Sequence, residues 1–373
     1  MRIYRVRTPA WCTGRVQHVD VAVIGAGQAG LSASYFLQRA GLTAWDDYVV
    51  LDGAPAPGGA WQFRWPSLTL ETVNGVHDLP GMAFADTLDP DVDPAHVPAS
   101  TAVPEYYARY EKHFELPVRR PGRVSVVCDR DERYRVEAEQ GDVHARGLIN
   151  CTGTWEHPFV PNYRGMSTFR GRQLHTKDYV DADEFRGKHV VVVGGGISAV
   201  QLLDEISRVT TTTWVTRREP VWLDREFTPE VGRAAVAQVE DRVRQGLPPG
   251  SVVSVTGLIL TPSLREARER GALDRFPMFS EVVPDGVRWD DGSTVDADVI
   301  LWATGFRSAL DHLAPLRLRG AGGGITMTGA SATQVAARPT VHLIGYGPSA
   351  STIGANRAGR TAVRELLREL GRS

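Results

Sequence analysis

The 373-residue sequence predicts an α/β fold that contains two parallel-sheet units, one inserted into the other. Two observations support this fold class. A β-branched strand that runs into a glycine-rich turn and then a helix occurs twice, and each helix is followed by a second short strand. The length, about twice that of an average domain, leaves room for both units. With 42% hydrophobic and 23% charged residues, the composition is typical of globular chains and excludes a disordered one.

The first unit is expected at residues 19–52. A strand over 19–24 runs into the turn 25–30, a helix continues to about Ala40, and a second strand, 48–51, ends at Asp52. In a GxGxxG turn the first glycine bends the chain, the second leaves space for a pyrophosphate, and the third lets helix and strand pack. A plain α/β turn is the alternative interpretation. The expected nucleotide contacts are Gly25, Gly27, Gln28, Ala29, Gly30 and Asp52.

The second unit is expected at residues 189–218. A strand over 189–193 enters the turn Gly194-Gly195-Gly196-Ile197-Ser198-Ala199, a helix extends to about Ser207, and a strand over 211–216 follows. Alanine at the third glycine position is an accepted variant. The expected nucleotide contacts are Gly194, Gly196, Ile197, Ser198, Ala199, Arg217 and Arg218.

The two units differ after their second strand. Asp52 lies 22 positions after Gly30, where a carboxylate accepts a hydrogen bond from a ribose 2′-hydroxyl and repels a 2′-phosphate. Arg217 and Arg218 stand at the same place in the second unit, where guanidinium groups would hold an adenosine 2′-phosphate. A solvated arginine pair is the alternative. We therefore expect two Rossmann-like dinucleotide-binding domains, with FAD in the first and NADPH in the second.

Further elements connect and complete these domains. Two strand-turn segments, 147–153 and 299–305, are expected to cross between the domains, with Thr152, Gly153, Thr304 and Gly305 at the cofactor. Residues 54–100 show no hydrophobic periodicity and are expected to form an irregular cover over a ligand. Residues 224–276 are interpreted as an insertion at the rim of the second domain. The predicted boundaries are an N-terminal extension 1–17, an FAD-binding domain 18–157 with 285–373, and an NAD(P)H-binding domain 158–284.

Charge and cysteine usage exclude several function classes. The 42 basic and 44 acidic residues nearly cancel, which argues against nucleic-acid or membrane-surface partners. The three cysteines form no CxxC pair, so neither a zinc knuckle nor a redox dithiol is expected, and no metal-ligand spacing is found. We expect a cytoplasmic protein, because no apolar run reaches the about 18 residues of a membrane span and residues 1–17 do not resemble a signal peptide.

Residues 169–179, FRGRQLHTKDY, fit the pattern FxGxxxHxxxY just before the second glycine turn. This pattern resembles the fingerprint of flavin-containing monooxygenases; the related Baeyer–Villiger enzymes usually show Trp followed by Pro or Asp, where this chain has Tyr179-Val180. The chain from about Val19 to Leu370 is similar to the small bacterial members of that superfamily. Supporting segments are Pro57-Gly58-Gly59-Ala60-Trp61, Ala303-Thr304-Gly305-Phe306 and Gly345-Tyr346-Gly347.

The resemblance implies an FAD-dependent, NAD(P)H-consuming monooxygenase. Such enzymes form a C4a-(hydro)peroxyflavin and oxygenate a small molecule, either a soft nucleophile (sulfide or amine) or a ketone, and some accept NADH as well as NADPH. Relatives also suggest a homodimer. The resemblance places His175 near the nicotinamide nucleotide, although a structural histidine that fixes the interdomain linker is the alternative. Gly59, Trp61 and Gly347 would contact FAD, with an ordinary core role as the alternative for Trp61 and Trp65.

One position departs from the family pattern. Many relatives carry an asparagine near the flavin that hydrogen-bonds the oxygenated cofactor. The matching position here is Glu71, with Asn74 three residues on, and either could stabilise the peroxide. An NADPH-flavin reductase or oxidase without oxygen insertion is therefore the second hypothesis. A non-catalytic nucleotide-binding sensor is the third, disfavoured because two intact glycine turns imply a hydride path.

Overall fold

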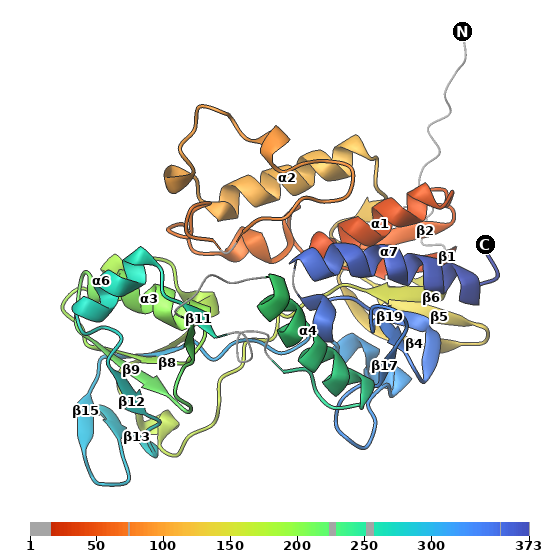
Figure 1. Ribbon diagram of the computed structural model, residues 1–373. Coiled ribbons are helices and arrows are strands. Elements are labelled where there is room, and N and C mark those ends of the chain that lie inside the picture. The colour runs from red at the N-terminus through yellow and green to blue at the C-terminus, as the bar shows by residue number, and fades with distance from the viewer. Residues whose placement is uncertain (1–15, 74, 224–228, 251–256, 351, 373) are drawn as a thin grey trace.

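The computed structural model describes residues 16–73, 75–223, 229–250, 257–350 and 352–372; for 229–235 and 352–353 it describes only the backbone. The two predicted units form two separate lobes that lie side by side, each built on a mainly parallel sheet (Figure 1). The predicted α/β fold class with two Rossmann-like units is thereby confirmed.

The first lobe contains a nine-stranded sheet among the described residues, in the order β17-β18-β19-β6-β1-β2-β3, with β4 and β5 attached to β6. Its strands are β1 (Gln17–Ile24), β2 (Tyr48–Leu51), β3 (Val118–Arg119), β4 (Val124–Arg130), β5 (Arg133–Ala138), β6 (Val143–Asn150), β17 (Met327–Thr328), β18 (Gln334–Val335) and β19 (Arg338–Leu343). Its helices are α1 (Gln28–Arg39), α2 (Ala99–His113) and α7 (Thr352–Glu369).

The second half of the central strand β1 is buried on both faces, which explains its unbroken apolar run from Val21 to Ile24. Val21 and Val23 belong to a core shared with α1 and α7, whereas Ala22 and Ile24 belong to a core on the opposite face. An apolar stripe of α7 and the residue after it faces the core that contains Val21 and Val23, since its members are all buried: Val363, Leu366, Leu367 and Leu370.

The second lobe contains a five-stranded parallel sheet in the order β12-β9-β8-β16-β7. Its strands are β7 (Arg172–His175), β8 (Val190–Val193), β9 (Thr212–Thr216), β12 (Arg275–Pro277) and β16 (Val299–Trp302). Two smaller sheets join β10 (Trp222–Leu223) to β11 (Leu258–Ile259), and β13 (Glu281–Val283) to β14 (Gly286–Arg288) and β15 (Thr294–Asp296). The helices α3 (Ile197–Ser207) and α6 (Pro262–Glu269) cover one face (Figure 1).

The lobes divide the chain differently from the predicted boundary at residue 284. Strand β16 lies beyond that boundary but pairs with β7 and β8, and the β13–β15 sheet packs on the same lobe. The second lobe therefore extends to about Trp302. The short antiparallel strands of 281–296 carry no pattern that assigns them to either sheet, which is why the sequence did not place them.

In the described residues of 54–100, which are all but residue 74, there is no strand, and no α-helix before α2 begins at Ala99. The lack of periodicity in this segment predicted its irregular structure. Helix α4 (Pro229–Arg244) differs from expectation, because its end packs on the first lobe rather than at the rim of the second (Figure 1). Val243 is fully buried there, and Arg244 donates to the carbonyl oxygen of Gly329. The remaining elements are short 3₁₀ turns: η2 (Gly59–Phe63), η3 (Ala85–Thr87), η4 (Pro94–His96), η5 (Met166–Thr168), η6 (Thr176–Asp178), η7 (Ala182–Phe185), η8 (Asp311–Leu316) and η9 (Gly347–Ala350).

Candidate cofactor and substrate site

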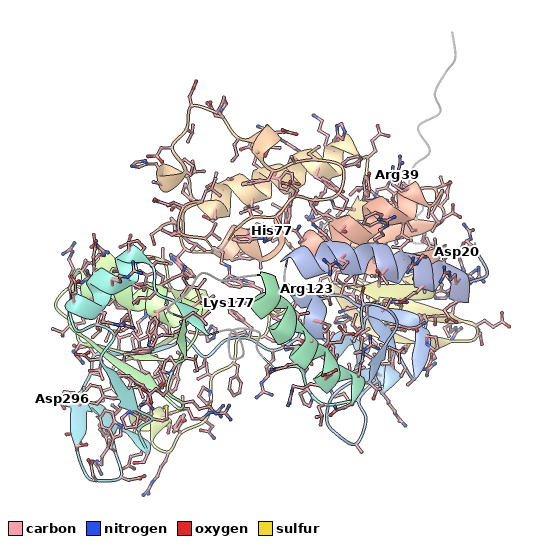
Figure 2. All side chains as sticks on the ribbon, in the orientation of Figure 1. Asp20, Arg39, His77, Arg123, Lys177 and Asp296 are labelled. Atoms are coloured by element: carbon pink, nitrogen blue, oxygen red, sulfur yellow. The ribbon has the colours of Figure 1, made fainter. Side chains whose placement is uncertain are left out.

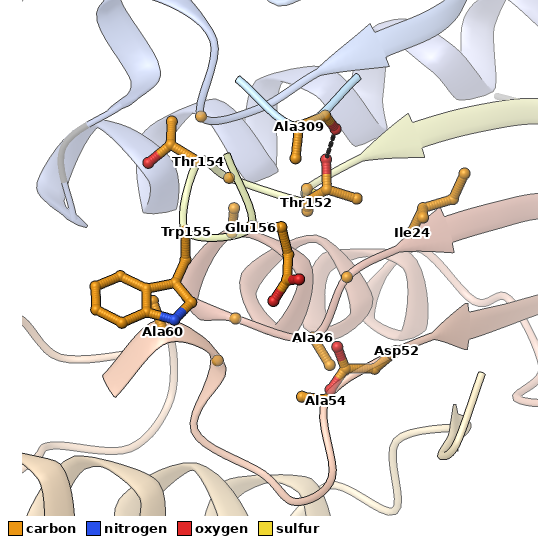
Figure 3. A pocket seen from close by; sticks show the side chains of 18 of the residues that line it. Ile24, Ala26, Asp52, Ala54, Ala60, Thr152, Thr154, Trp155, Glu156 and Ala309 are labelled. Carbon is orange, nitrogen blue, oxygen red and sulfur yellow. Dashed lines mark hydrogen bonds between the residues drawn. The ribbon is translucent and has the colours of Figure 1, made fainter. Parts of the chain in front are cut away.

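A cavity of about 630 Å³ opens at the carboxyl ends of β1, β2 and β6. In open α/β sheets this edge is where ligands bind. Figure 3 shows Ala26, Asp52 and Thr152 around one part of the cavity and Trp155 at another. Of the predicted contacts, the cavity brings together Gly25, Gly27, Gln28, Ala29, Asp52, Gly59, Trp61, Thr152 and Gly153.

The glycines of the first turn have different physical roles. A Cβ on Gly25 would lie 2.6 Å from the carbonyl oxygen of Cys151, and one on Gly30 would lie 1.8 Å from that of Gly25, so the fold itself requires both. A Cβ on Gly27 would meet no protein atom within 4 Å, and its φ of −79° suits any residue. The missing side chain at Gly27 therefore keeps space open in the cavity.

Helix α1 begins at that space without a side-chain cap or an acidic residue in its first turn. Its first N–H groups are left for a ligand, and the helix dipole favours a negative one. An FAD pyrophosphate fits this donor set.

Asp52 is buried at the end of β2 and held by Arg120, which follows the neighbouring strand β3. The guanidinium donates to the Oδ2 atom of Asp52 from Nε at 2.9 Å and from Nη2 at 2.7 Å, and also contacts both oxygens of Glu111 at 3.0 Å. Burial raises the pKa of Glu111, while Arg120 acts to lower it. The Oδ1 atom of Asp52 accepts no hydrogen bond from a described residue and remains for a ribose hydroxyl.

The second glycine turn repeats the geometry of the first outside this cavity. A Cβ on Gly194 would lie 2.2 Å from the carbonyl oxygen of Ala303, whereas one on Gly196 would meet nothing within 4 Å. Helix α3 also starts without a side-chain cap, so Ile197 and Ser198 present free N–H groups in its first turn. Ala199 is fully buried against the sheet, as the third position of the motif requires.

Arg217 and Arg218 follow β9 and are both exposed. Among the described residues neither side chain forms an ion pair or hydrogen bond, so both cations are free to receive a phosphate. The neighbouring Arg275 is instead engaged, because its Nε donates to Oγ1 of Thr216 at 2.6 Å.

His175 ties the end of β7 to the crossing segment 299–305. Its Nδ1 accepts from the backbone N–H of Lys177 at 3.1 Å, so Nε2 carries the proton and donates to the carbonyl oxygen of Gly305 at 2.9 Å. Burial lowers the pKa of His175, which keeps the ring neutral. The adjacent Thr304 donates to the carbonyl oxygen of Phe159. His175 does not line the cavity, and its contacts support the linker role.

The other predicted residues occupy varied positions. Thr152 donates to the carbonyl oxygen of Ala309 at 2.6 Å (Figure 3). Gly347 has a φ of +72° and packs against Val243 rather than lining the cavity. Glu71 is exposed and also lies outside the cavity lining. Asn74 falls outside the described residues.

Several lining residues were not predicted. Tyr107 donates to Oε1 of Gln28 at 2.5 Å, and Nε2 of His312 donates to Oδ1 of Asn150 at 2.7 Å. Burial lowers the pKa of His312 to about 4. Trp155 and Phe306 could have been found, because they lie two residues and one residue after the two crossing segments. Their rings stack with centroids 5.1 Å apart.

Comparisons with known proteins agree with this site. A family model described as pyridine nucleotide-disulphide oxidoreductase matches residues 22–248. The chain is 38% identical to a flavin-containing monooxygenase from Stenotrophomonas maltophilia, whose solved structure superposes with a TM-score of 0.79 over 95% of this chain and 100% of that one. It is 26% identical to an uncharacterized oxidoreductase of Geobacillus kaustophilus, over 82% of this chain and 88% of that protein.

More distant matches share parts of the sequence or the fold alone. A Baeyer-Villiger monooxygenase of Streptomyces coelicolor is 27% identical over 62% of this chain and 43% of its own length. A bacillithiol disulfide reductase from Staphylococcus aureus has the same fold, with a TM-score of 0.68 at 15% identity. The absence of a CxxC pair separates the present sequence from dithiol chemistry.

Proposed function

The chain belongs to the superfamily of flavin-containing monooxygenases, and on that premise we propose that its cavity binds FAD and its second glycine turn binds NADPH. It is an oxidoreductase of the monooxygenase type, which uses a flavin, a nicotinamide cofactor, O₂ and a small-molecule substrate. The substrate classes proposed are sulfides, amines and ketones.

The observation that carries the assignment of FAD is the pairing of Gly27 with Asp52 in one cavity. The uncapped start of α1 offers N–H donors to a pyrophosphate, and Asp52 offers a free carboxylate oxygen to the ribose. A buried carboxylate at this place disfavours a 2′-phosphate, which FAD lacks.

Arg217 and Arg218 support NADPH as the second cofactor. Both are exposed cations at the end of β9, beside the uncapped start of α3, and the described residues supply no carboxylate to them. A guanidinium pair discriminates by charge, so NADH would be bound more weakly rather than excluded.

When bound, FAD supplies the chemistry: it accepts hydride from NADPH and activates O₂. The chain's residues position and enclose it. His175 fixes the turn after β16 against the end of β7. Trp61, Trp155 and Phe306 line the cavity with apolar rings that exclude water.

A flavin reductase or oxidase is the second candidate. Glu71, which takes the place of the family asparagine, is exposed and does not line the cavity. Consumption of NADPH with hydrogen peroxide as the only oxygen product would favour this alternative. Oxygenated substrate would favour the monooxygenase.

The assignment of cofactors is tested by reconstitution. The purified protein is incubated with FAD, freed of excess ligand by gel filtration and scanned for flavin absorbance, after which NADPH and NADH are added separately. We expect retained flavin and faster reduction by NADPH. Absence of bound flavin would contradict the proposal at its first step.

We further propose a cytoplasmic homodimer. No helix in the described part of the chain is long and apolar enough to cross a membrane. The dimer rests on the family resemblance, and sedimentation equilibrium of the FAD-loaded protein tests it by its mass.

A further inference from the structure

Two cations surround the indole of Trp155 where the two lobes meet. The guanidinium carbon of Arg64 lies 4.8 Å from the Trp155 ring centroid and 6.0 Å from that of Trp61. The Nζ atom of Lys177 lies 5.9 Å from the Trp155 centroid. Arg64 comes from the segment after η2 and Lys177 from η6, so each lobe contributes one charge. Figure 2 shows Lys177 at this junction.

Neither cation is neutralised by the described residues. The structure records no ion pair or side-chain hydrogen bond for Arg64 or Lys177 within that part of the chain. The nearby carboxylates have other partners, since Glu156 faces Arg123 at 3.8 Å and Asp178 accepts from the backbone N–H of His175 at 3.0 Å.

The position of Arg64 makes its lack of a partner significant. Arg64 lines the cavity, and burial lowers its pKa, because the surrounding protein displaces water from the charged group. Contact with an indole compensates only part of the lost hydration. An anion beside the guanidinium would offset the cost of burying this charge.

The cofactor anions already have sites elsewhere. The pyrophosphate of FAD is assigned to the start of α1, that of NADPH to the start of α3, and the 2′-phosphate to Arg217 and Arg218. An anion at Arg64 must therefore come from another molecule. The rings beside it, Phe63, Trp155 and Phe306, are stacked with centroids 5.1–6.1 Å apart and suit an apolar or aromatic body.

We propose that the substrate carries a carboxylate, which Arg64 and Lys177 bind while its apolar body packs on the rings around Trp155. This inference rests on the proposed function and names the substrate class of the same site. For a sulfide the reaction balances as one oxygen atom of O₂ joining sulfur and the other leaving as water, with two electrons from NADPH and one proton from solvent.

The test compares 4-(methylthio)benzoate with methyl phenyl sulfide, which lacks the carboxylate. For each, kcat/KM of sulfoxide formation is measured in the FAD-loaded wild type and in the Arg64→Gln and Lys177→Gln variants. We expect the wild type to have a higher kcat/KM for 4-(methylthio)benzoate than for methyl phenyl sulfide. Arg64→Gln should reduce the ratio of these two values by roughly 10- to 100-fold, because one or two charge-assisted contacts are lost. Arg64→Lys should retain part of this preference.

The matched control is Arg268→Gln. Arg268 also lies 4.8 Å from an indole, that of Trp222, but outside the cavity, so its loss should leave the preference unchanged. A wild type that favours methyl phenyl sulfide, or an Arg64→Gln variant that slows both substrates equally, would overturn the inference. A selective rise in the KM for NADPH would also overturn it, because the cations would then serve the nucleotide.

Binding of a non-oxidisable probe keeps this inference separate from the proposed function. Calorimetric titration of the oxidised FAD-loaded protein with 4-isopropylbenzoate should show binding that 4-isopropylbenzamide lacks and that Arg64→Gln weakens. If neither sulfide is oxygenated, the monooxygenase assignment fails while this titration still tests the anion site. Equal binding of acid and amide would refute the anion site.

Discussion

Arg120 donates two hydrogen bonds to a single oxygen of Asp52, at 2.9 and 2.7 Å, and the second oxygen of this cavity-lining carboxylate accepts none from the described residues. The same guanidinium also pairs with the partly buried Glu111. Arg120 therefore acts as a positioning residue, because its two hydrogen bonds fix the orientation of the Asp52 carboxylate.

Replacing Arg120 by Met should weaken FAD binding and lower the free energy of unfolding by about 3 kcal/mol, because two buried carboxylates lose their cation. Chemical unfolding and fluorescence titration with FAD measure the two effects. The control is Arg338→Met, which breaks the exposed bidentate pair with Asp129 and should cost less than about 1 kcal/mol. Unchanged FAD affinity in Arg120→Met would exclude the positioning role.

The glycines of the first turn should respond differently to alanine. Gly30→Ala places a Cβ 1.8 Å from the Gly25 carbonyl oxygen and should prevent stable folding. Gly27→Ala meets no protein atom, so it should fold normally but bind FAD at least about tenfold more weakly, since the methyl group occupies space for the phosphates. Circular dichroism reports folding and a flavin titration reports binding. Normal FAD affinity in Gly27→Ala would show that the pyrophosphate does not approach there.

Arg217→Ala and Arg218→Ala should each raise the KM for NADPH by roughly 10-fold or more while changing the KM for NADH much less, because only NADPH carries the 2′-phosphate. Steady-state kinetics of flavin reduction with both nucleotides measure the ratio. Arg186→Ala, at an exposed arginine of the same lobe that pairs with Asp183, serves as the control. Equal effects on both nucleotides would remove the basis for assigning NADPH.

Acid should destabilise the protein through histidines whose pKa is lowered by burial, and the shifts are largest for His312 and His342. Burial lowers the pKa of His312 and of His342 to about 4, from 6.5 in the unfolded chain. Between these values the unfolded state binds protons that the folded state does not, so stability is complete above pH 6.5 and falls as the pH drops toward 4. Each histidine would contribute about 3 kcal/mol to this loss.

His342→Gln tests this pH dependence away from the cavity. The side chain is fully buried in β19, where Nδ1 lies 3.2 Å from Oγ1 of Thr333. Urea unfolding of the variant between pH 4 and 7 should show a smaller pH dependence than that of the wild type. An identical pH profile in both proteins would mean that His342 does not titrate in this range.

The sequence predicted those parts of the fold that depend on residues close together in the chain. Both strand-turn-helix units follow from buried parallel strands, which read as apolar runs, and from turns in which a Cβ at Gly25 or Gly194 would clash with a carbonyl oxygen. Asp52 and the first glycine turn share one cavity because the carboxyl ends of neighbouring parallel strands meet at one sheet edge.

Contacts between distant segments could not be predicted in this way. Arg120 reaches Asp52 across 68 residues because β3 pairs with β2, and a two-residue strand leaves almost no pattern. The docking of α4 on the first lobe depends on Val243 entering a core formed by other segments. The cluster of Arg64, Trp155 and Lys177 joins residues from three loops, which tertiary packing alone brings together.

The most direct test of the monooxygenase assignment is the fate of isotopic oxygen. The FAD-loaded protein is supplied with NADPH, methyl phenyl sulfide and ¹⁸O₂, and the sulfoxide is analysed by mass spectrometry alongside NADPH consumption and hydrogen peroxide release. The account predicts sulfoxide that carries one ¹⁸O atom from O₂ and is formed in proportion to the NADPH oxidised. Oxidation of NADPH that yields labelled hydrogen peroxide and no labelled sulfoxide, with the amine and ketone substrates equally unlabelled, would contradict it.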